Sequence, residues 1–294
     1  MKQLVVISGK GGTGKTIISA SFAALAQNKV IVDCDVDAAD LYLLLHPEIQ
    51  ESHQFIGGKK AKLDLEKCTR CGECTKVCRF SAIEENPIGE FIIDPISCEG
   101  CGICSYICPV EAIAMEENIS GEWFVSQTKY GPFVHARLAI AEENSGKLVT
   151  EVREKAKEIA EKNRLDFVII DGPPGIGCPV IASLSGTDLA LVVTEPTLSG
   201  IHDMERAIQM AHHFKTKTAC CINKFDINLK NSEQIENWCN KNSIPLVGKV
   251  PFEDNVTKSM VQGIPLTEFS NNSAAKEIKK IWQKLIKLLA TEDH

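Results

Sequence analysis

Short apolar runs alternate with longer segments of helical periodicity along most of the chain. Mainly apolar runs that end in polar or glycine residues predict strands over 4–8, 29–33, 167–171, 189–194, 218–223 and 246–250. Apolar residues three and four positions apart predict helices over 16–28, 147–163, 201–214, 232–241 and 274–290. Strands separated by helices favour parallel pairing in one doubly wound α/β sheet with helices on both faces.

Residues 60–118 break this rhythm, because they are rich in cysteine, punctuated by glycine and poor in long apolar runs. Their six Lys and Arg residues against eleven Asp and Glu residues give −5 of the formal net charge of −7. Two segments at 122–128 and 133–138 then flank Tyr130-Gly131-Pro132, a pattern typical of a hairpin. We therefore predict a discontinuous α/β domain, 1–58 plus 119–294, interrupted by a small α+β insert at 59–118.

The first predicted strand leads directly into a glycine-rich loop that opens a helix. The loop matches G-x-x-x-x-G-K-[ST] with Gly9, Lys10, Gly11, Gly12, Thr13, Gly14, Lys15 and Thr16. Glycines let the backbone wrap a polyphosphate with successive N–H groups at the helix N-terminus. Lys15 would bring its charge to the β- and γ-phosphates, and the Thr16 hydroxyl would bind Mg²⁺. This strand–loop–helix context predicts a nucleoside triphosphate site.

Acidic residues close two of the predicted strands. Asp33 and Asp35 stand at the end of the strand over 29–33, and we expect them to point to opposite faces and to differ in role. Asp171 ends the apolar strand over 167–171, which is the Walker B arrangement. An aspartate at such a strand end can hold a Mg²⁺-bound water.

Thirteen cysteines are unusually many for a chain of 294 residues, and eight of them are regularly spaced. The pattern C-x₂-C-x₂-C-x₃-C occurs twice, offset by 30 residues, and is the run of bacterial ferredoxins with two [4Fe–4S] clusters. In that run the fourth cysteine binds the other cluster. One cluster would therefore take Cys68, Cys71, Cys74 and Cys108, and the second would take Cys78, Cys98, Cys101 and Cys104. Zinc is the competing metal, but it needs neither the third cysteine at this spacing nor the duplicated fourth.

The second lysine of the loop, Lys10, makes the sequence resemble the MinD/ParA/Mrp group of P-loop ATPases, which includes the nitrogenase iron protein. The resemblance implies that Lys10 reaches the partner's phosphates in a nucleotide-sandwiched homodimer, as an arginine finger does elsewhere. It also assigns Asp35 to the attacking water and Asp33, with Thr16 and Asp171, to Mg²⁺. Catalysis would thus rest on Lys10, Lys15 and Asp35.

Base recognition has two interpretations. The segment from Asn223 to Asp226 reads N-K-x-D, which is a guanine-reading pattern in GTPases. In the MinD-like group an Asn at this strand end contacts adenine and a later segment, here Pro251-Phe252, wraps the base. Because the resemblance covers the whole interrupted domain, we favour ATP over GTP.

Nearly the full chain resembles MinD-superfamily ATPases with an inserted ferredoxin domain. The resemblance implies an iron–sulfur ATPase that gates electron transfer to a redox acceptor. The alternatives are an ATP-gated carrier or assembly factor for metal clusters, and a MinD-like positioning ATPase with structural clusters. The partner would be a second copy, or a related chain in a heterodimer. We hypothesise that segments 130–138 and 142–149 transmit the nucleotide state to the clusters.

Charge and hydropathy narrow the setting. A net charge of −7 argues against nucleic-acid binding. The chain contains no run of 18 apolar residues, so we predict no membrane-spanning segment. The first residues do not resemble a signal peptide, so we expect a cytoplasmic protein. The apolar stripe of the helix over 274–290 could bind a membrane or dock on the sheet, and we favour docking. Cys178 could bind a cluster at a dimer interface, although a buried or redox-silent thiol is our default.

Overall fold

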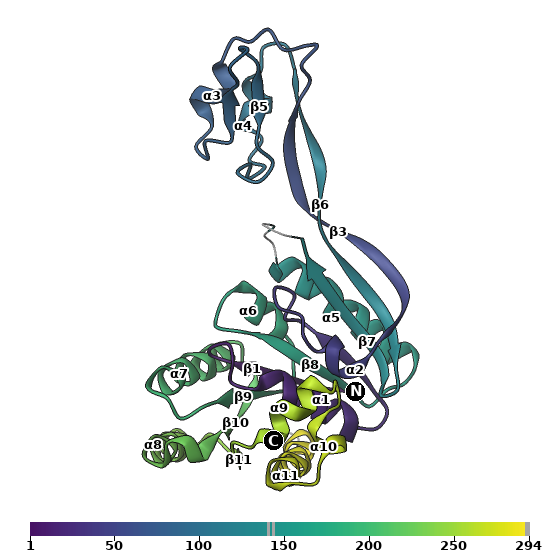
Figure 1. The fold of residues 1–294 in the computed structure, drawn as a ribbon, viewed down its shortest axis with the longest axis vertical. Coiled ribbons are helices and arrows are strands. Elements are labelled where there is room, and N and C mark those ends of the chain that lie inside the picture. Colours follow the sequence, from purple (N-terminus) through teal and green to yellow (C-terminus); the bar gives the residue numbers. More distant parts are fainter. Residues whose placement is uncertain (140–141, 143–144, 292–294) are drawn as a thin grey trace. The chain divides into compact units, whose positions relative to one another are not determined.

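The computed structural model describes residues 1–139, 142 and 145–291. It divides the chain into two compact units. The core unit comprises Met1–Ser52, Trp123–Arg137 and Ser145–His294, and the insert unit comprises His53–Glu122 and Leu138–Asn144. Strand β3 (Glu48–Leu63) leaves the core unit and strand β6 (Ile113–Thr128) returns to it, so both strands cross the boundary (Figure 1).

The main sheet has the strand order β11-β10-β9-β1-β8-β2-β7-β6-β3. Neighbouring strands from β11 to β7 are parallel, which confirms the predicted mostly parallel α/β sheet. The parallel strands are β1 (Lys2–Ser8), β2 (Lys29–Asp33), β7 (Gly131–Leu138), β8 (Phe167–Pro174), β9 (Leu189–Thr194), β10 (Lys217–Asn223) and β11 (Leu246–Val250). Strands β2 and β9 are buried at every position, as expected for parallel strands covered on both faces.

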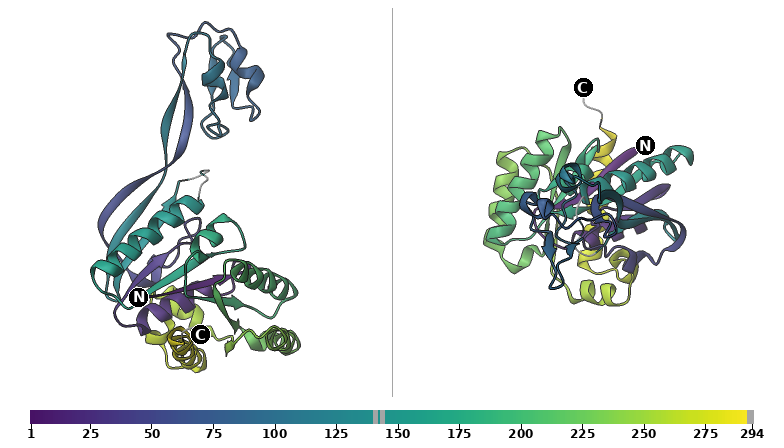
Figure 2. Two further views of the ribbon diagram at one scale, coloured as in Figure 1. Left: turned by 180° about the vertical axis from the view of Figure 1, so that it is seen from behind. Right: turned by 90° about the horizontal axis from the view of Figure 1, so that it is seen from above.

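Helices cover both faces of this sheet (Figures 1 and 2). Helices α1 (Lys15–Leu25) and α11 (Ser273–Ala290) share one hydrophobic core with the strands and with each other. On the other face lie α5 (Ser145–Lys162), α6 (Cys178–Leu184), α7 (Leu198–His213) and α8 (Leu229–Lys241). Because the helices lie on the faces of the sheet, the carboxyl ends of the strands are followed by loops. Parallel α/β sheets bind their ligands at this edge.

The final helix is docked on the sheet through its apolar stripe. Ile278, Ile281, Trp282, Leu285 and Leu289 are buried, and α11 packs against β11 and α1. The amphipathic pattern of this helix is therefore explained by its packing on the sheet, which is the interpretation that we favoured from the sequence. Within the described residues, no helix combines the length and apolarity needed to cross a membrane.

Several elements differ from the sequence prediction. Helix α1 ends at Leu25 rather than at residue 28, because Ala26 is extended and Asn28 takes a left-handed φ of 50°. Strand β3 was not predicted, since most of its side chains are exposed and show no apolar alternation. The short elements α2 (Tyr42–Leu45), α9 (Asp254–Val261), α10 (Leu266–Phe269) and the 3₁₀ turn Phe225–Ile227 were also missed, because three to eight residues carry too little periodicity.

The insert unit repeats one local arrangement. Helices α3 (Glu73–Val77) and α4 (Ile103–Ile107) each follow a left-handed glycine, Gly72 and Gly102, with φ of 71° and 76°. Strands β4 (Ile83–Glu85) and β5 (Phe91–Ile93) pair antiparallel. A small core of Ala61, Ile83, Phe91, Cys104 and Ile113 packs against four further cysteines of the repeat, Cys68, Cys74, Cys78 and Cys98. This unit has a far smaller apolar core than the core unit.

His135 lies in the aromatic packing of β7. Its ring stacks on Phe133 and Phe124, with centroids 4.6 and 5.0 Å away, and its Nε2 lies 3.0 Å from the Ser126 hydroxyl. Burial, together with the charge of Arg137, lowers the pKa of His135 to about 4. The imidazole is therefore neutral in the folded chain at neutral pH.

We expect His135 to make the core unit acid-labile. The unfolded chain binds this proton near pH 6.5, whereas the folded chain binds it only near pH 4. Stability is therefore complete above about pH 6.5 and falls by about 3 kcal/mol as the pH drops to 4. Urea unfolding of the parent and of His135→Gln between pH 7 and 4.5 should show a shallower loss in the variant. The exposed His213→Gln is the control and should lose stability with falling pH as the parent does. If the free energy of unfolding falls equally with pH in the parent and in His135→Gln, the assignment is contradicted.

Candidate functional site

A pocket of about 540 Å³ opens at the carboxyl ends of the parallel strands. Its volume is within the range of small-molecule sites. Its walls come from the loop after β1, the segment after β2, and the ends of β8 and β10, with α2 and α9 on the apolar side. Lining residues that were predicted from the sequence are Gly11, Gly12, Thr13, Gly14, Lys15, Thr16, Asp35, Asn223 and Pro251.

The loop between β1 and α1 has the tight backbone that the P-loop pattern requires. Gly14 takes a φ of 86° and leaves no room for a Cβ, because Asn223 Nδ2 lies against it. That same nitrogen donates a 2.7 Å hydrogen bond to the Thr13 carbonyl. The Thr13 Oγ1 atom is buried and has no hydrogen-bond partner among the residues that the structure describes. Asn223 thus fixes the loop, and the Thr13 hydroxyl inside the loop stays available for a ligand.

Lys15 is buried among three carboxylates. Its Nζ lies 3.1 Å from Asp171 Oδ1 and 3.4 Å from Asp35 Oδ2, and its side chain is 6% exposed. Burial alone would lower the pKa of Lys15, but the charges of Asp171, Asp35 and Asp33 outweigh it and raise that pKa. The ammonium is therefore firmly charged, as a phosphate ligand must be.

Asp33 and Asp35 differ in their surroundings, and the roles predicted for them stay predictions. Both Asp33 oxygens accept main-chain hydrogen bonds, from Asp35 N at 3.0 Å and from Leu41 N at 3.3 Å. Burial and the nearby charge of Asp171 raise the pKa of Asp33 well above its usual range. Asp35 instead lines the pocket, and burial also raises its pKa. Asp33 therefore holds the loop that presents Asp35, and its predicted place in the Mg²⁺ shell stays a prediction.

Asp171 has a free oxygen that suits a cation or its water. Oδ1 accepts hydrogen bonds from Lys15 and from the Ser19 hydroxyl, at 3.1 and 2.7 Å. Oδ2 is buried without a hydrogen-bond partner in the described part of the chain. A hard oxygen donor of this kind fits Mg²⁺, and its partner Lys15 is followed directly by Thr16, which lines the pocket. Ser19 was missed by the sequence analysis, because a serine one turn into a helix carries no signal.

The opposite end of the pocket is apolar. Leu43, Val256 and Met260 line it together with Pro251 and Phe252, whose side chain is 56% exposed. Exposed apolar side chains beside a phosphate loop can cover a flat base.

The N-K-x-D residues are engaged within the protein. Lys224 Nζ donates to the Gly12 carbonyl at 3.0 Å, and Asp226 Oδ1 accepts the Phe252 N–H at 2.8 Å. Asn223 is engaged as well, since its Nδ2 donates to the Thr13 carbonyl. These contacts tie the segment to the phosphate loop and to Phe252, and the preference for ATP over GTP stays a prediction.

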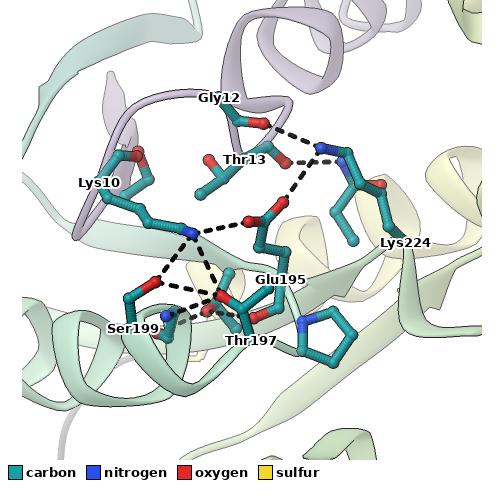
Figure 3. Close-up of polar contacts among 12 residues, drawn as sticks. Lys10, Gly12, Thr13, Glu195, Thr197, Ser199 and Lys224 are labelled. Carbon is teal, nitrogen blue, oxygen red and sulfur yellow. Dashed lines mark hydrogen bonds and ion pairs between the residues drawn. The ribbon is translucent and has the colours of Figure 1, made fainter. Parts of the chain in front are cut away.

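Lys10 is held within its own chain (Figure 3). Its Nζ lies 2.7 Å from Glu195 Oε1 and 3.1 Å from both the Thr197 and Ser199 hydroxyls. Glu195 Oε2 also binds Lys224 at 3.1 Å. Burial would raise the pKa of Glu195, but hydrogen bonds and charge from the two lysines outweigh it and lower that pKa. Glu195 was not predicted, because its role depends on loops far apart in the sequence.

The eight clustered cysteines line two small cavities in sets of four. Cys68, Cys71, Cys74 and Cys108 line one cavity, and Cys78, Cys98, Cys101 and Cys104 line the other. Mainly apolar side chains fill the remaining walls, with Glu99 in one cavity and Thr69 and Glu73 in the other. Main-chain N–H groups donate to thiol sulfurs, from Ala82 to Cys78 at 3.4 Å and from Ala112 to Cys108 at 3.2 Å.

This donor set fits iron–sulfur clusters, which are held by four thiolates and tuned by hydrogen bonds to sulfur. Among the residues that the structure describes, no group of three or more His, Cys, Asp or Glu is arranged to hold a metal ion. The ferredoxin insert and its clusters therefore stay a prediction.

The other cysteines divide by burial. Cys34, Cys220, Cys221 and Cys239 are buried in the core unit. Cys178 is exposed at the start of α6, so it is not a buried thiol, and the alternative of a redox-silent thiol stays a prediction. A Cβ at Gly146 would lie 3.3 Å from the Cys178 side chain, so the start of α5 packs closely on this segment.

Comparison with known proteins agrees with this site. The model of the CobQ/CobB/MinD/ParA nucleotide binding domain matches residues 4–266. An uncharacterised protein of Methanocaldococcus jannaschii is 35% identical over 289 residues, covering 96% of each chain. The iron-sulfur cluster carrier protein of Pyrococcus furiosus is 28% identical over 158 residues, which cover 49% of this chain and 53% of the carrier.

Solved structures show the same fold. The septum site-determining protein MinD of Pyrococcus horikoshii, complexed with Mg-ADP, has a TM-score of 0.60 at 16% identity. The matched region covers 98% of this chain and 97% of the MinD chain. Since the family match spans most of the chain and contains the complete P-loop, the chain belongs to the CobQ/CobB/MinD/ParA family as a MinD/ParA-like P-loop ATPase.

Proposed function

We propose that this ATPase closes as a nucleotide-dependent homodimer that is coupled to two [4Fe–4S] clusters and gates electron transfer to a partner protein. The observation that carries the proposal is the sorting of eight cysteines into two cavities of four, in a chain that also has a P-loop pocket. The same sorting follows from the crossed spacing of the sequence. ATP chemistry and one-electron chemistry would thus reside in one protein.

The P-loop residues would perform hydrolysis. Lys15 and the loop N–H groups would bind the β- and γ-phosphates, and Thr16 with Asp171 would hold Mg²⁺, which neutralises developing charge when bound. Asp35 would orient and activate the attacking water. Its raised pKa makes the carboxylate a stronger base than an exposed aspartate. Lys10 would complete the phosphate site of the partner subunit.

The insert would carry the redox function. Each set of four thiols would hold one cluster, and a [4Fe–4S] cluster supplies one-electron transfer when bound. Mainly apolar walls and N–H donors to the sulfurs would be the protein's means of setting the cluster potential. ATP binding could change that potential, or the access of an acceptor, by shifting the dimer between open and closed states.

A second function is favoured by one relative. The Pyrococcus furiosus protein that matches about half of this chain is an iron-sulfur cluster carrier. Here the clusters would be the cargo, and ATP would gate their release to an acceptor protein. The two functions differ in whether iron leaves the chain during turnover.

Lys15→Ala should abolish most ATP hydrolysis. Loss of a preorganised positive charge at the phosphates costs about 10²–10³ in rate. Steady-state ATPase of the purified protein, with Lys230→Ala as an exposed control, measures this. The variant also leaves the buried carboxylates without their cation, so its melting temperature should fall. Unchanged hydrolysis in a folded variant would refute the catalytic assignment.

Crossed ligation predicts which pairs of cysteines act together. Cys71→Ser with Cys108→Ser affects one set of four, so about half of the iron should remain. Cys71→Ser with Cys78→Ser affects both sets, so nearly all iron should be lost. Iron and acid-labile sulfide content of anaerobically purified protein distinguishes the two. The reverse pattern would mean uncrossed ligation, and iron loss on Cys178→Ser alone would indicate a cluster at that thiol.

Electron gating predicts that nucleotide changes the cluster potential. An EPR-monitored redox titration of the cluster-loaded protein, with and without Mg-ATP, should show a shift of about 40–130 mV. Such a shift corresponds to a coupling free energy of about 1–3 kcal/mol. Retained clusters with unshifted potentials would exclude gating through the potential. Transfer of iron and sulfide to an apo-protein on ATP addition would favour the carrier function.

A further inference from the structure

One carboxylate binds both Lys10 of the phosphate loop and Lys224, which anchors that loop. Glu195 lies in the short connection between β9 and α7, and its side chain is 13% exposed. Its two oxygens are divided between two partners, with Oε1 on Lys10 and Oε2 on Lys224 (Figure 3). Neither the P-loop pattern nor the acidic strand ends include this residue, so its place in the ATPase cycle is unassigned.

The contacts of Lys10 saturate its ammonium group. An ammonium has three N–H donors. Here it has three acceptors from one stretch of chain, namely the Glu195 carboxylate and the hydroxyls of Thr197 and Ser199. Thr197 is itself fixed, because its hydroxyl also caps α7 by accepting the Gly200 N–H at 3.0 Å. Lys10 is thus bound to a preformed site in its own subunit.

The second partner of Glu195 anchors the loop itself. Lys224 bridges Glu195 and the Gly12 carbonyl, at 3.1 and 3.0 Å. The N-terminal end of the loop is also tied to α7, because a Cβ at Gly9 would collide with the main chain of Asp203. Glu195 therefore contacts the loop through two separable arms, one through Lys10 and one through Lys224.

We infer that Glu195 is a positioning residue that retains Lys10 in its own subunit and so opposes formation of the nucleotide-bound dimer. The inference rests on the proposed function, in which Lys10 reaches the partner's phosphates. To do so, Lys10 must leave Glu195, Thr197 and Ser199. The charge-assisted contact with Glu195 is the strongest of the three. Because each subunit gives up one such contact, the closed dimer is disfavoured twice.

Removing the charge of Glu195 should therefore strengthen the dimer. Glu195→Gln keeps the size of the side chain and removes the ion pair. The dimer dissociation constant, measured by sedimentation with Mg²⁺ and a non-hydrolysable ATP analogue, should fall by about 3-fold to 30-fold, as the loss of two partly exposed ion pairs would give. The protein concentration for half-maximal ATPase should fall in parallel. Glu233→Gln, an exposed glutamate on α8, is the matched control.

Two further variants separate the arms. In a Lys10→Ala background, adding Glu195→Gln should leave the dissociation constant unchanged, since the effect acts through Lys10. Lys224→Met removes only the other arm, so it should weaken nucleotide binding without strengthening the dimer. If Lys224→Met strengthens the dimer as much as Glu195→Gln does, the effect acts through the loop anchor and the inference is wrong.

The outcomes also separate this inference from the proposed function. A parent protein that stays monomeric with the ATP analogue would refute the dimer on which the inference depends. A parent that dimerises, together with a Glu195→Gln variant that dimerises equally or more weakly, would refute the inference alone. A tighter dimer whose gain disappears with Lys10→Ala would support it.

Discussion

The buried contact between Lys15 and its carboxylates determines how the nucleotide site is built. A charge removed from water is tolerated only when opposite charge surrounds it. The parallel sheet supplies that charge, because the ends of β2 and β8 bring Asp33 and Asp171 beside the start of α1. Asp35 joins them only because Asp33 accepts main-chain N–H groups from the following loop. The pocket thus follows from strand order, and each carboxylate has a separate role.

A second cation, Lys10, is handled differently, and the difference separates binding from assembly. Lys15 lies deep and is surrounded by acids of the sheet, whereas Lys10 is 27% exposed and faces one carboxylate and two hydroxyls of the β9–α7 connection. A group held at the surface by a few exchangeable contacts can change partner at modest free-energy cost. The loop residues that face the nucleotide are therefore firmly anchored, while the residue proposed to act on the partner subunit is reversibly held.

The sequence predicted the features that depend on residues close together in the chain. The P-loop, the two cysteine runs and the buried strands β2, β9 and β11 depend on patterns within about ten residues, and the structure has those strands at the predicted bounds. The sequence analysis missed contacts between residues that are far apart in the chain and meet only in the folded structure. Glu195 and Ser19 become site residues only when β9 and α1 lie beside the loop, and β3 forms a strand although its polar sequence shows no alternation. The predicted extent of the insert and the roles of the site residues remain predictions.

Covalent connections show how nucleotide state could influence the insert. Strand β3 follows α2, whose Leu43 and Leu44 line the nucleotide pocket. Strand β6 leads into β7, which pairs with β2 just before Asp33. On the return path, Gly146 at the start of α5 packs on Cys178, seven residues beyond Asp171; residues 143 and 144 of the segment proposed to transmit the signal lie outside the described residues. Strand β3 is thus continuous with α2, which lines the pocket, and β6 is continuous with β7, which pairs with the strand that ends at Asp33. A shift of those elements on nucleotide binding would act directly on the chain that enters and leaves the insert, without a dedicated pathway of side chains.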